Sequence, residues 1–395
     1  MKEKREKLKR VIAVVLLALL AVSLCACESP QRVINVYNWG EYLPDGSEGS
    51  IDVNALFTEK TGIKVNYINY QTNEEMYAKL SGGGVSYDVI IPSDYMIERM
   101  IKEGMLQKLD FENIPNYKYI IDQYKNLPYD ENNEYSVPYT VGYVGLIYNT
   151  KVVTEKPTSW SVLWDEKYAG NILMIDNSRD AFAVAQFLLG QDVNTTDEEE
   201  LRAAADKLKE QKPLVQKYVM DEIFNKMESG EAALGVYYAG DFLTMHDNNE
   251  DLAFVYPEEG TNFFVDAMCI PTCANDKEAA EMYIDFLLSP EIALEIAEYI
   301  CYATPNSSVL ENEEYSLKDN EFLYPDQNAM DNAQIFSYLP PETTDYVNTL
   351  WNEISVSGIE YGYFYIAFGI AAVVIVAVII IVAVRKKKRS NYEED

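Results

Sequence analysis

The first third of the chain alternates short β-type apolar runs with helical segments, and this alternation restricts the fold more than any other feature. Runs rich in β-branched and aromatic residues occur at 33–37, 63–67 and 88–91. Residues 73–80 have helical spacing and are followed by three glycines at 82–84. Strands that alternate with helices predict an α/β fold with a mainly parallel sheet. Such sheets bind ligands in a crevice at the carboxyl ends of their strands.

The second half of the chain repeats this alternation without repeating the sequence. Strands are predicted at 172–175, 233–237, 253–256 and 265–270, and helices at 179–189, after Asp197, after Ser289-Pro290 and around 347–354. A chain of 395 residues is long enough for two such units. We therefore expect two lobes with a cleft between them: lobe 1 from 32–140 and 265–310, and lobe 2 from 141–264 and 311–357.

Charge and composition exclude several classes of function. The chain has 64 acidic and 32 basic residues, a net charge of −32, which argues against a nucleic-acid partner. His246 is the single histidine, so no His-based zinc site can form, and a Ser-His-Asp triad would have to use this residue. Cys269, Cys273 and Cys301 lack metal-ligand spacing, and an odd count forbids pairing all three. A Cys269–Cys301 bridge remains an alternative in an oxidising compartment, although a disulfide is not our preferred interpretation. No metal or cofactor is expected.

The N-terminal residues 1–27 are typical of a signal peptide. Basic residues at 2–10 precede an apolar run at 11–24, which is short for a transmembrane helix. The run ends in Leu24-Cys25-Ala26-Cys27, which resembles a bacterial lipobox. We expect lipidation at Cys27 in a bacterial protein, and ordinary cleavage or an uncleaved anchor is the alternative.

The C-terminal region predicts a membrane anchor. Residues 366–384 are unbroken apolar sequence, preceded by several aromatic residues and followed by five consecutive cations at 385–389. This pattern indicates a transmembrane helix at 363–384 and a basic cytoplasmic tail at 385–395. The bulk of the chain is then expected outside the cell or in a periplasm, held at the membrane.

Seven runs along the chain carry a family resemblance. They are YNWGEY at 37–42, NEEMYAKL at 73–80, YDVIIPSDY at 87–95, VPY at 137–139, TSW at 158–160, FVD at 264–266 and YATPN at 302–306. In order and spacing across residues 32–355, this set resembles the spermidine/putrescine-binding proteins of bacterial polyamine ABC importers. The resemblance implies a type II periplasmic-binding fold and a protein that captures polyamines for an ABC permease and its ATPase subunits, without being an enzyme.

The chemistry of a polyamine fits the composition of the chain. Its ammonium groups need carboxylates, and its methylenes and charges suit aromatic faces, which this tyrosine-rich chain supplies. The resemblance implies a site made of Trp39, Glu41, Tyr42, Ser93, Tyr95, Asn177, Asp180, Tyr238, Phe264, Asp266 and Tyr302. Asp266 is expected to bind the central ammonium group. Asn177 stands where the family commonly has an acid, while Tyr238 and Phe264 replace two tryptophans.

Other functions remain open at this point. Tyr237 and Tyr238 are adjacent, as in ferric-binding proteins of the same fold, although neighbouring strand residues usually point to opposite faces. An acidic, aromatic cleft is also typical of carbohydrate-active enzymes, in which two carboxylates flank the scissile bond. A sensor ectodomain is a further alternative. Locally, Ser93 and Asp176 could act as helix caps.

Overall fold

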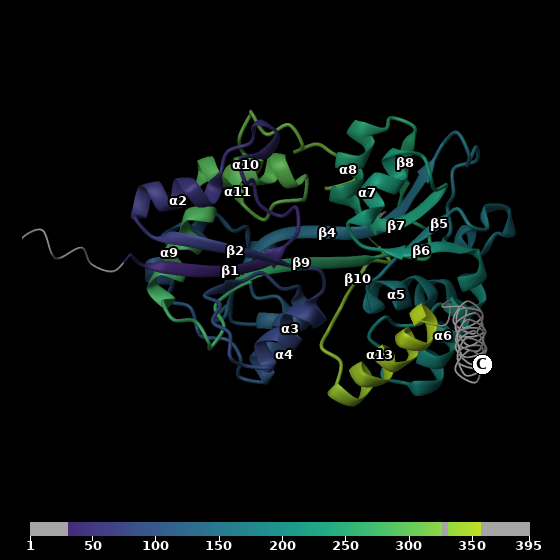
Figure 1. Cartoon of the computed structure of the whole chain (residues 1–395), viewed down its shortest axis with the longest axis horizontal. Helices are drawn as coiled ribbons and strands as arrows, with labels where there is room; N and C mark the ends of the chain where they lie inside the picture. The colour runs from purple at the N-terminus through teal and green to yellow at the C-terminus, as the bar shows by residue number, and fades with distance from the viewer. Residues whose placement is uncertain (1–30, 326–330, 357–395) are drawn as a thin grey trace, which may run out of the picture.

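The chain folds into two α/β lobes joined by long strands (Figure 1). The structure, a computed structural model, describes residues 31–325 and 331–356. Strands in the described chain form one sheet in the order β2-β1-β3-β9-β4-β7-β5-β6, with β10 paired to β9 and β8 paired to β4. The strands are β1 (Val33–Trp39), β2 (Lys64–Tyr70), β3 (Val89–Ile90), β4 (Ser136–Asn149), β5 (Ile172–Ile175), β6 (Val215–Val219), β7 (Leu234–Tyr238), β8 (Leu252–Val255), β9 (Asn262–Cys269) and β10 (Gln334–Ile335).

Lobe 1 is built on the parallel strands β2, β1 and β3. Alternate residues of β1 point to opposite faces, so Ile34 and Val36 enter one apolar core and Tyr37 enters the other. Helices therefore cover both faces (Figure 1). One face carries α2 (Val53–Thr61), α9 (Lys277–Leu287) and α10 (Pro290–Ile300), the other α3 (Asn73–Ser81) and α4 (Asp94–Lys102), and α11 (Ser307–Leu310) follows α10.

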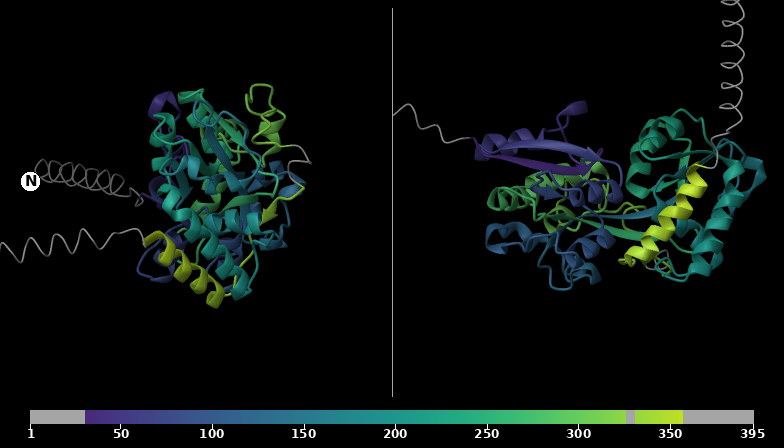
Figure 2. Two further views of the ribbon diagram at one scale, coloured as in Figure 1. Left: turned by 90° about the vertical axis from the view of Figure 1, so that its right-hand side faces the viewer. Right: turned by 60° about the horizontal axis from the view of Figure 1, so that its bottom comes forward.

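Lobe 2 is built around β5, which pairs in parallel with β6 and β7. The predicted cap is confirmed: the Asp197 carboxylate accepts the Glu199 and Glu200 amides at the start of α6. The helix α13 crosses this lobe and packs against α5 and α6 (Figure 2). The helices are α5 (Ser178–Leu189), α6 (Glu198–Gln211), α7 (Glu222–Glu228), α8 (Ala239–Asn248) and α13 (Pro341–Val356).

Two antiparallel strands, β4 and β9, run from one lobe into the other. The first half of β4 pairs with β9, from Ser136 opposite Cys269 to Tyr143 opposite Phe263, and its second half pairs with β7 and β8. These strands make the sheet mixed, whereas the sequence predicted a mainly parallel one. Since β4 is buried along its whole length, its sequence has no polar alternation, and it was not predicted as a strand.

The predictions for the chain ends require correction. No helix within 31–325 and 331–356 is long and apolar enough to cross a membrane. The longest described helix, α13, has 16 residues, or about 24 Å at 1.5 Å per residue, against the ~30 Å of a hydrocarbon core. The signal segment 1–27 with Cys27, the predicted transmembrane helix 363–384 and the tail 385–395 lie outside the described residues. The fold class shown by the described residues is therefore two α/β lobes, and the predicted C-terminal transmembrane helix is not supported.

Candidate functional site

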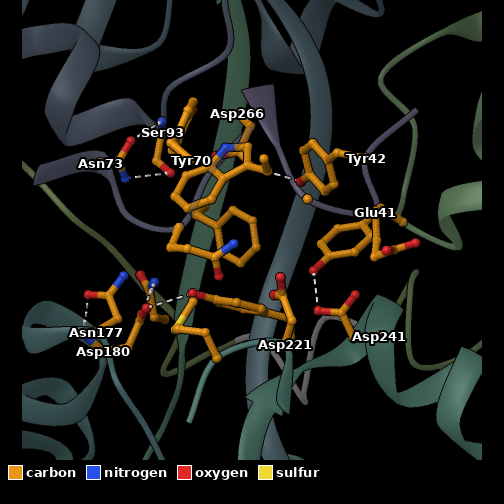
Figure 3. Close-up of a pocket in the computed structure, with 18 of the residues that line it drawn as sticks. Glu41, Tyr42, Tyr70, Asn73, Ser93, Asn177, Asp180, Asp221, Asp241 and Asp266 are labelled. Carbon is orange, nitrogen blue, oxygen red and sulfur yellow. Dashed lines mark hydrogen bonds between the residues drawn. The ribbon is translucent and has the colours of Figure 1, made fainter. Parts of the chain in front are cut away.

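A pocket lies between the two lobes at the carboxyl ends of several strands (Figure 3). It encloses about 700 Å³, part of which is open to solvent. All eleven residues of the predicted site line it. The pocket is further lined by Gly40, Tyr70, Gln71, Asn73, Asp94, Met220, Asp221, Phe224, Asp241, Asn262 and Phe336. None of these lining residues is a lysine, an arginine or a histidine.

Three carboxylates in the pocket each accept a hydrogen bond from a tyrosine hydroxyl. Tyr42 Oη donates to Asp266 Oδ2 at 2.6 Å. Tyr238 Oη donates to Asp180 Oδ2 at 3.0 Å. Tyr302 Oη donates to Asp241 Oδ2 at 2.9 Å. Because Tyr302 belongs to the lobe 1 core and Asp241 to α8 of lobe 2, this third bond crosses the cleft.

Burial is the main cause of the raised pKa of these three carboxylic acids. It raises the pKa of Asp180 and of Asp241 to about 7 and the pKa of Asp266 to about 6. Hydrogen bonds from Tyr238 and Tyr302 offset part of the rise in pKa at Asp180 and Asp241, and the Tyr42 and Ser93 hydroxyls do so at Asp266. Such shifts arise where burial is not offset by a close counter-ion, and of the three only Asp180 has a cation, Arg179, that lowers its pKa. The pocket is therefore suited to a positively charged ligand.

Aromatic rings connect these carboxylates. Tyr42 meets Tyr302 edge to face with ring centroids 5.3 Å apart, and Phe264 lies 5.3 Å from Tyr238 and 6.3 Å from Tyr302. Close backbone approach permits this packing: a Cβ on Gly240 would come within 2.3 Å of the Tyr302 ring. The rings offer apolar faces for hydrocarbon and negative faces for cations.

The lobe 1 wall is fixed by hydrogen bonds to the loop after β3. The Trp39 indole N–H and the Tyr70 hydroxyl both donate to the Ile91 carbonyl, at 2.8 and 2.7 Å. Ser93 stands at the N-cap position of α4, but its side chain makes no cap bond and instead accepts from Asn73 Nδ2 at 3.0 Å. The Ser93 hydroxyl is therefore held towards the pocket rather than used to cap the helix.

Asn177 has a structural task in lobe 2. Its side-chain oxygen accepts the Arg179 and Asp180 amides and caps α5. The neighbouring Arg179 reaches across the cleft: its guanidinium carbon lies 4.4 Å from the ring centroid of Phe336 and 5.2 Å from that of Tyr95, which is on α4 of lobe 1. The start of α5 thus contributes the carboxylate of Asp180 together with a contact between the lobes.

A comparison with known proteins identifies the family. The model of the bacterial extracellular solute-binding proteins matches residues 86–333. The chain belongs to this family. This solute-binding protein is 37% identical to a spermidine/putrescine-binding periplasmic protein of Salmonella typhimurium over 318 residues, covering 80% of this chain and 90% of the relative. The protein of the same name from Escherichia coli is 36% identical, with the same coverage.

Solved structures agree with the fold. A protein from Listeria monocytogenes superposes with a TM-score of 0.78 at 35% identity, covering 82% of this chain and 98% of that one. The spermidine/putrescine ABC transporter substrate-binding protein from Streptococcus pneumoniae gives a TM-score of 0.68 at 33% identity, covering 82% and 99%. The two-lobed periplasmic-binding fold is therefore confirmed.

These relatives also bear on the predicted location of the protein. They are named as periplasmic or ABC-transporter binding proteins, and the described residues contain no membrane-spanning helix. The predicted form with a C-terminal membrane anchor and a cytoplasmic tail at 385–395 is therefore not supported and is withdrawn. The predicted lipidation of Cys27 remains a prediction.

The adjacent tyrosines have different surroundings in the described structure. Tyr237 is 2% exposed, does not line the pocket, and its hydroxyl lies 3.4 Å from Asp221 Oδ1. Tyr238 faces the pocket and is bonded to Asp180. No cluster of three or more His, Cys, Asp or Glu side chains suited to a metal ion occurs in the described residues. None of the relatives named above is described as an iron-binding protein, so nothing favours the ferric alternative.

Sequence analysis missed two acidic residues of the pocket. Asp221 follows the end of β6, and Asp241 stands three residues after the end of β7. Parallel strands of an α/β sheet place such residues at the ligand-binding edge, so their position could have identified them. β6 itself was not predicted, and Asp241 lies outside the motifs that carry the family resemblance. Asp94 also lines the pocket, but its carboxylate has a structural role, because its two oxygens accept hydrogen bonds from the Tyr95 and Val265 amides.

Proposed function

We propose that this protein is the substrate-binding component of an ABC importer and captures polyamines in the pocket between its lobes. The observation that carries this proposal is the set of three tyrosine–carboxylate pairs with no basic residue among the pocket-lining residues. The relatives named for spermidine and putrescine support the same ligand class.

The polyamine is recognised through charge and aromatic contact. Each ammonium group donates hydrogen bonds to a carboxylate, and charge-assisted hydrogen bonds of this kind contribute about 1.5–3 kcal/mol. The rings of Trp39, Tyr238 and Phe264 line the pocket and contact the methylenes of the ligand. Where a ring face also contacts an ammonium group, the cation–π interaction contributes about 0.5–2 kcal/mol. The eleven residues of the predicted site, all of which line the pocket, are its binding residues in this proposal.

Ligand capture involves both lobes. Trp39, Tyr42 and Ser93 belong to lobe 1, whereas Asp180 and Tyr238 belong to lobe 2. β4 and β9 run between the lobes, so bending of these strands can open the cleft. A ligand that contacts both sides stabilises the closed arrangement, which the permease and its ATPase subunits then recognise.

The function is one of binding rather than catalysis. The relatives are named as transport proteins. The alternative of a glycoside hydrolase needs one carboxylic acid and one carboxylate, placed on either side of the sugar bond. In this pocket each of the three buried carboxylates is bonded to a tyrosine and is arranged to hold a cation.

Calorimetric titration of the purified protein with putrescine, spermidine, spermine and Fe³⁺ tests the proposal. We expect polyamine binding that Asp266→Asn weakens by about 100-fold and Asp266→Ala abolishes, because the buried acceptor of the ammonium group is lost. Asp247→Asn, an exposed substitution on α8, is the control with the same charge change. Binding of Fe³⁺ alone, or unchanged polyamine affinity in both Asp266 variants, would refute the assignment.

A further inference from the structure

The segment 334–339, here called the strap, leads from β10 to the start of α13 and passes between α4 of lobe 1 and α5 of lobe 2 (Figure 1). Residues in its first half are bonded to lobe 2. The Asn194 side chain donates to the Ile335 carbonyl at 2.9 Å and accepts the Ser337 amide at 2.8 Å. Arg179 on α5 donates to the Ser337 carbonyl at 3.3 Å. The strap is therefore attached to lobe 2.

The next residue of the strap, Tyr338, is bonded to lobe 1. Its backbone N–H donates to Glu98 Oε2 on α4 at 2.7 Å. The other oxygen, Glu98 Oε1, accepts from Lys102 Nζ one helical turn further on at 2.6 Å, and this ammonium group lies 4.5 Å from the centroid of the Tyr338 ring. The Glu98 side chain is only 19% exposed, so water competes weakly for its oxygens. A charge-assisted hydrogen bond therefore joins the strap to lobe 1.

This bond is a discrete contact and not part of a continuous core. A cavity of about 360 Å³, partly open to solvent, lies beside it between α4, the strap and α13. Its lining residues include Met96, Arg99, Tyr338, Leu339, Val347 and Asn348. Because α4 and α13 are separated here by a cavity, few other contacts hold the strap on this part of lobe 1. Opening of the cleft therefore has to break the bond to Glu98.

The strap also forms part of the ligand pocket. Phe336, two residues before Tyr338, is 4% exposed and lines the pocket. Its ring lies 6.0 Å from that of Tyr95 on α4, edge to face, and the Arg179 guanidinium carbon is 4.4 Å from its centroid. The bond to Glu98 thus holds the strap on lobe 1 close to the point where Phe336 meets Tyr95. A change at Glu98 can reach the pocket although Glu98 does not line it.

We propose that Glu98 is a positioning residue for ligand capture, which holds the strap on lobe 1 in the closed protein and so slows release of the ligand. This inference rests on the proposed function. The bond joins groups of two lobes, so it forms on closure and breaks on opening. A ligand enters the open cleft, where the bond is absent, but leaves only after the bond has broken. Loss of the bond should therefore raise the dissociation rate and leave the association rate nearly unchanged.

Stopped-flow tryptophan fluorescence with spermidine tests the proposal, because Trp39 lines the pocket. We expect Glu98→Ala to raise the dissociation rate by about 10-fold, as the loss of one charge-assisted hydrogen bond implies, and to change the association rate by less than about threefold. Glu98→Gln keeps a side-chain oxygen for the Tyr338 amide, so its dissociation rate should stay within about threefold of the wild type. Glu98→Ser is too short to accept this amide and should match Glu98→Ala.

A control on the same helix separates the strap bond from a general effect of surface charge. Glu103, the C-cap residue of α4, pairs with Arg99 at 3.0 Å in the same i,i+4 spacing and makes its contacts within lobe 1. Glu103→Ala should leave both rates unchanged, and the thermal midpoint of each ligand-free variant checks that it is folded. An unchanged dissociation rate in Glu98→Ala, or equal rates in Glu98→Ala and Glu98→Gln, would overturn the role of Glu98, while wild-type binding upholds the proposed function. Absence of polyamine binding by the wild type would overturn both.

Discussion

The hydroxyl of Tyr42 joins Asp266, which lines the pocket, to Thr140, which lies behind it. It lies 2.6 Å from Asp266 Oδ2 and 2.7 Å from Thr140 Oγ1, and both side chains belong to the strands that connect the lobes. Tyr42 itself is on the loop after β1 and is 6% exposed. The tyrosine therefore fixes the orientation of the carboxylate at the point where β4 and β9 pair.

Tyr42→Phe should reduce both stability and ligand affinity. The substitution removes the 2.6 Å hydrogen bond that Tyr42 donates to the buried Asp266 carboxylate, which costs about 1–3 kcal/mol. We expect a loss of this size in the free energy of unfolding, measured with urea, and a loss of about 10-fold or more in polyamine affinity. Tyr77→Phe is the matched control, because its hydroxyl donates an equally short 2.6 Å bond to Glu103 at the surface, where water can replace it. Equal destabilisation by the two substitutions would contradict this explanation.

Polyamine binding should become stronger as the pH rises from about 5 to about 8. Burial raises the pKa of Asp180, Asp241 and Asp266 from 3.8 to between about 6 and about 7, so the free protein carries protons that an ammonium ligand must displace. Titrations in two buffers with different ionisation enthalpies should detect proton release on binding. Proton uptake, or an affinity independent of pH, would contradict the assigned carboxylates.

The same three groups make the ligand-free protein less stable as the pH rises. A raised folded-state pKa means that the folded state binds more protons than the unfolded chain between about pH 4 and pH 7, so these groups lower the free energy of unfolding across that range. A bound cation stabilises the ionised carboxylates and so removes this loss of folding stability. We therefore expect the shift in thermal midpoint caused by spermidine to be larger at pH 8 than at pH 5. A larger shift at pH 5 would show that other groups control binding.

Gly240→Ala should disrupt the contact between the lobes. A Cβ at this position would lie 2.3 Å from the Tyr302 ring and 2.8 Å from the Cys301 carbonyl oxygen, so the ring must move away from Asp241. We expect a loss of polyamine affinity of at least about 10-fold by calorimetry. In Gly235→Ala, the control on β7, the Cβ would meet the flexible ends of Ile223 and Met227, and binding should persist. Tyr302→Phe removes the bond without moving the backbone and should give a smaller loss.

Arg179→Lys should destabilise the folded protein, chiefly within lobe 2. The buried guanidinium donates to Asn194 Oδ1 and to the Ser337 carbonyl and stacks on Phe336, and a lysine cannot reproduce this planar set of contacts. We expect a loss of about 1–3 kcal/mol in the free energy of unfolding, measured with urea. Arg202→Lys is the control, because Arg202 contacts Tyr346 at the exposed surface. No difference between the two variants would contradict a stabilising role for Arg179.

Local sequence determined most strands of each lobe and half of the residues that line the pocket. The run at 172–175 is β5 with the predicted bounds, Asp197 caps α6, and α10 begins at Pro290 as predicted. These features depend on side chains close in the sequence: β-branched residues in a buried strand, a carboxylate that accepts helix amides, and a proline that suits the first turn. Eight of the eleven predicted residues lie in the motifs shared with the polyamine-binding family, and the family resemblance outside those motifs implied Asn177, Asp180 and Tyr238. All eleven line the pocket.

Only the tertiary structure placed β4 across both lobes and brought Asp241 to Tyr302. The periodicity of β4 carries no signal, because neighbouring strands and helices bury both of its faces. The bond between Asp241 and Tyr302 joins residues 61 positions apart, each positioned by a different lobe. The sequence therefore determined which residue types face the pocket. Packing of the lobes decided which carboxylates share the pocket, since burial and separation from counter-ions depend on the whole fold.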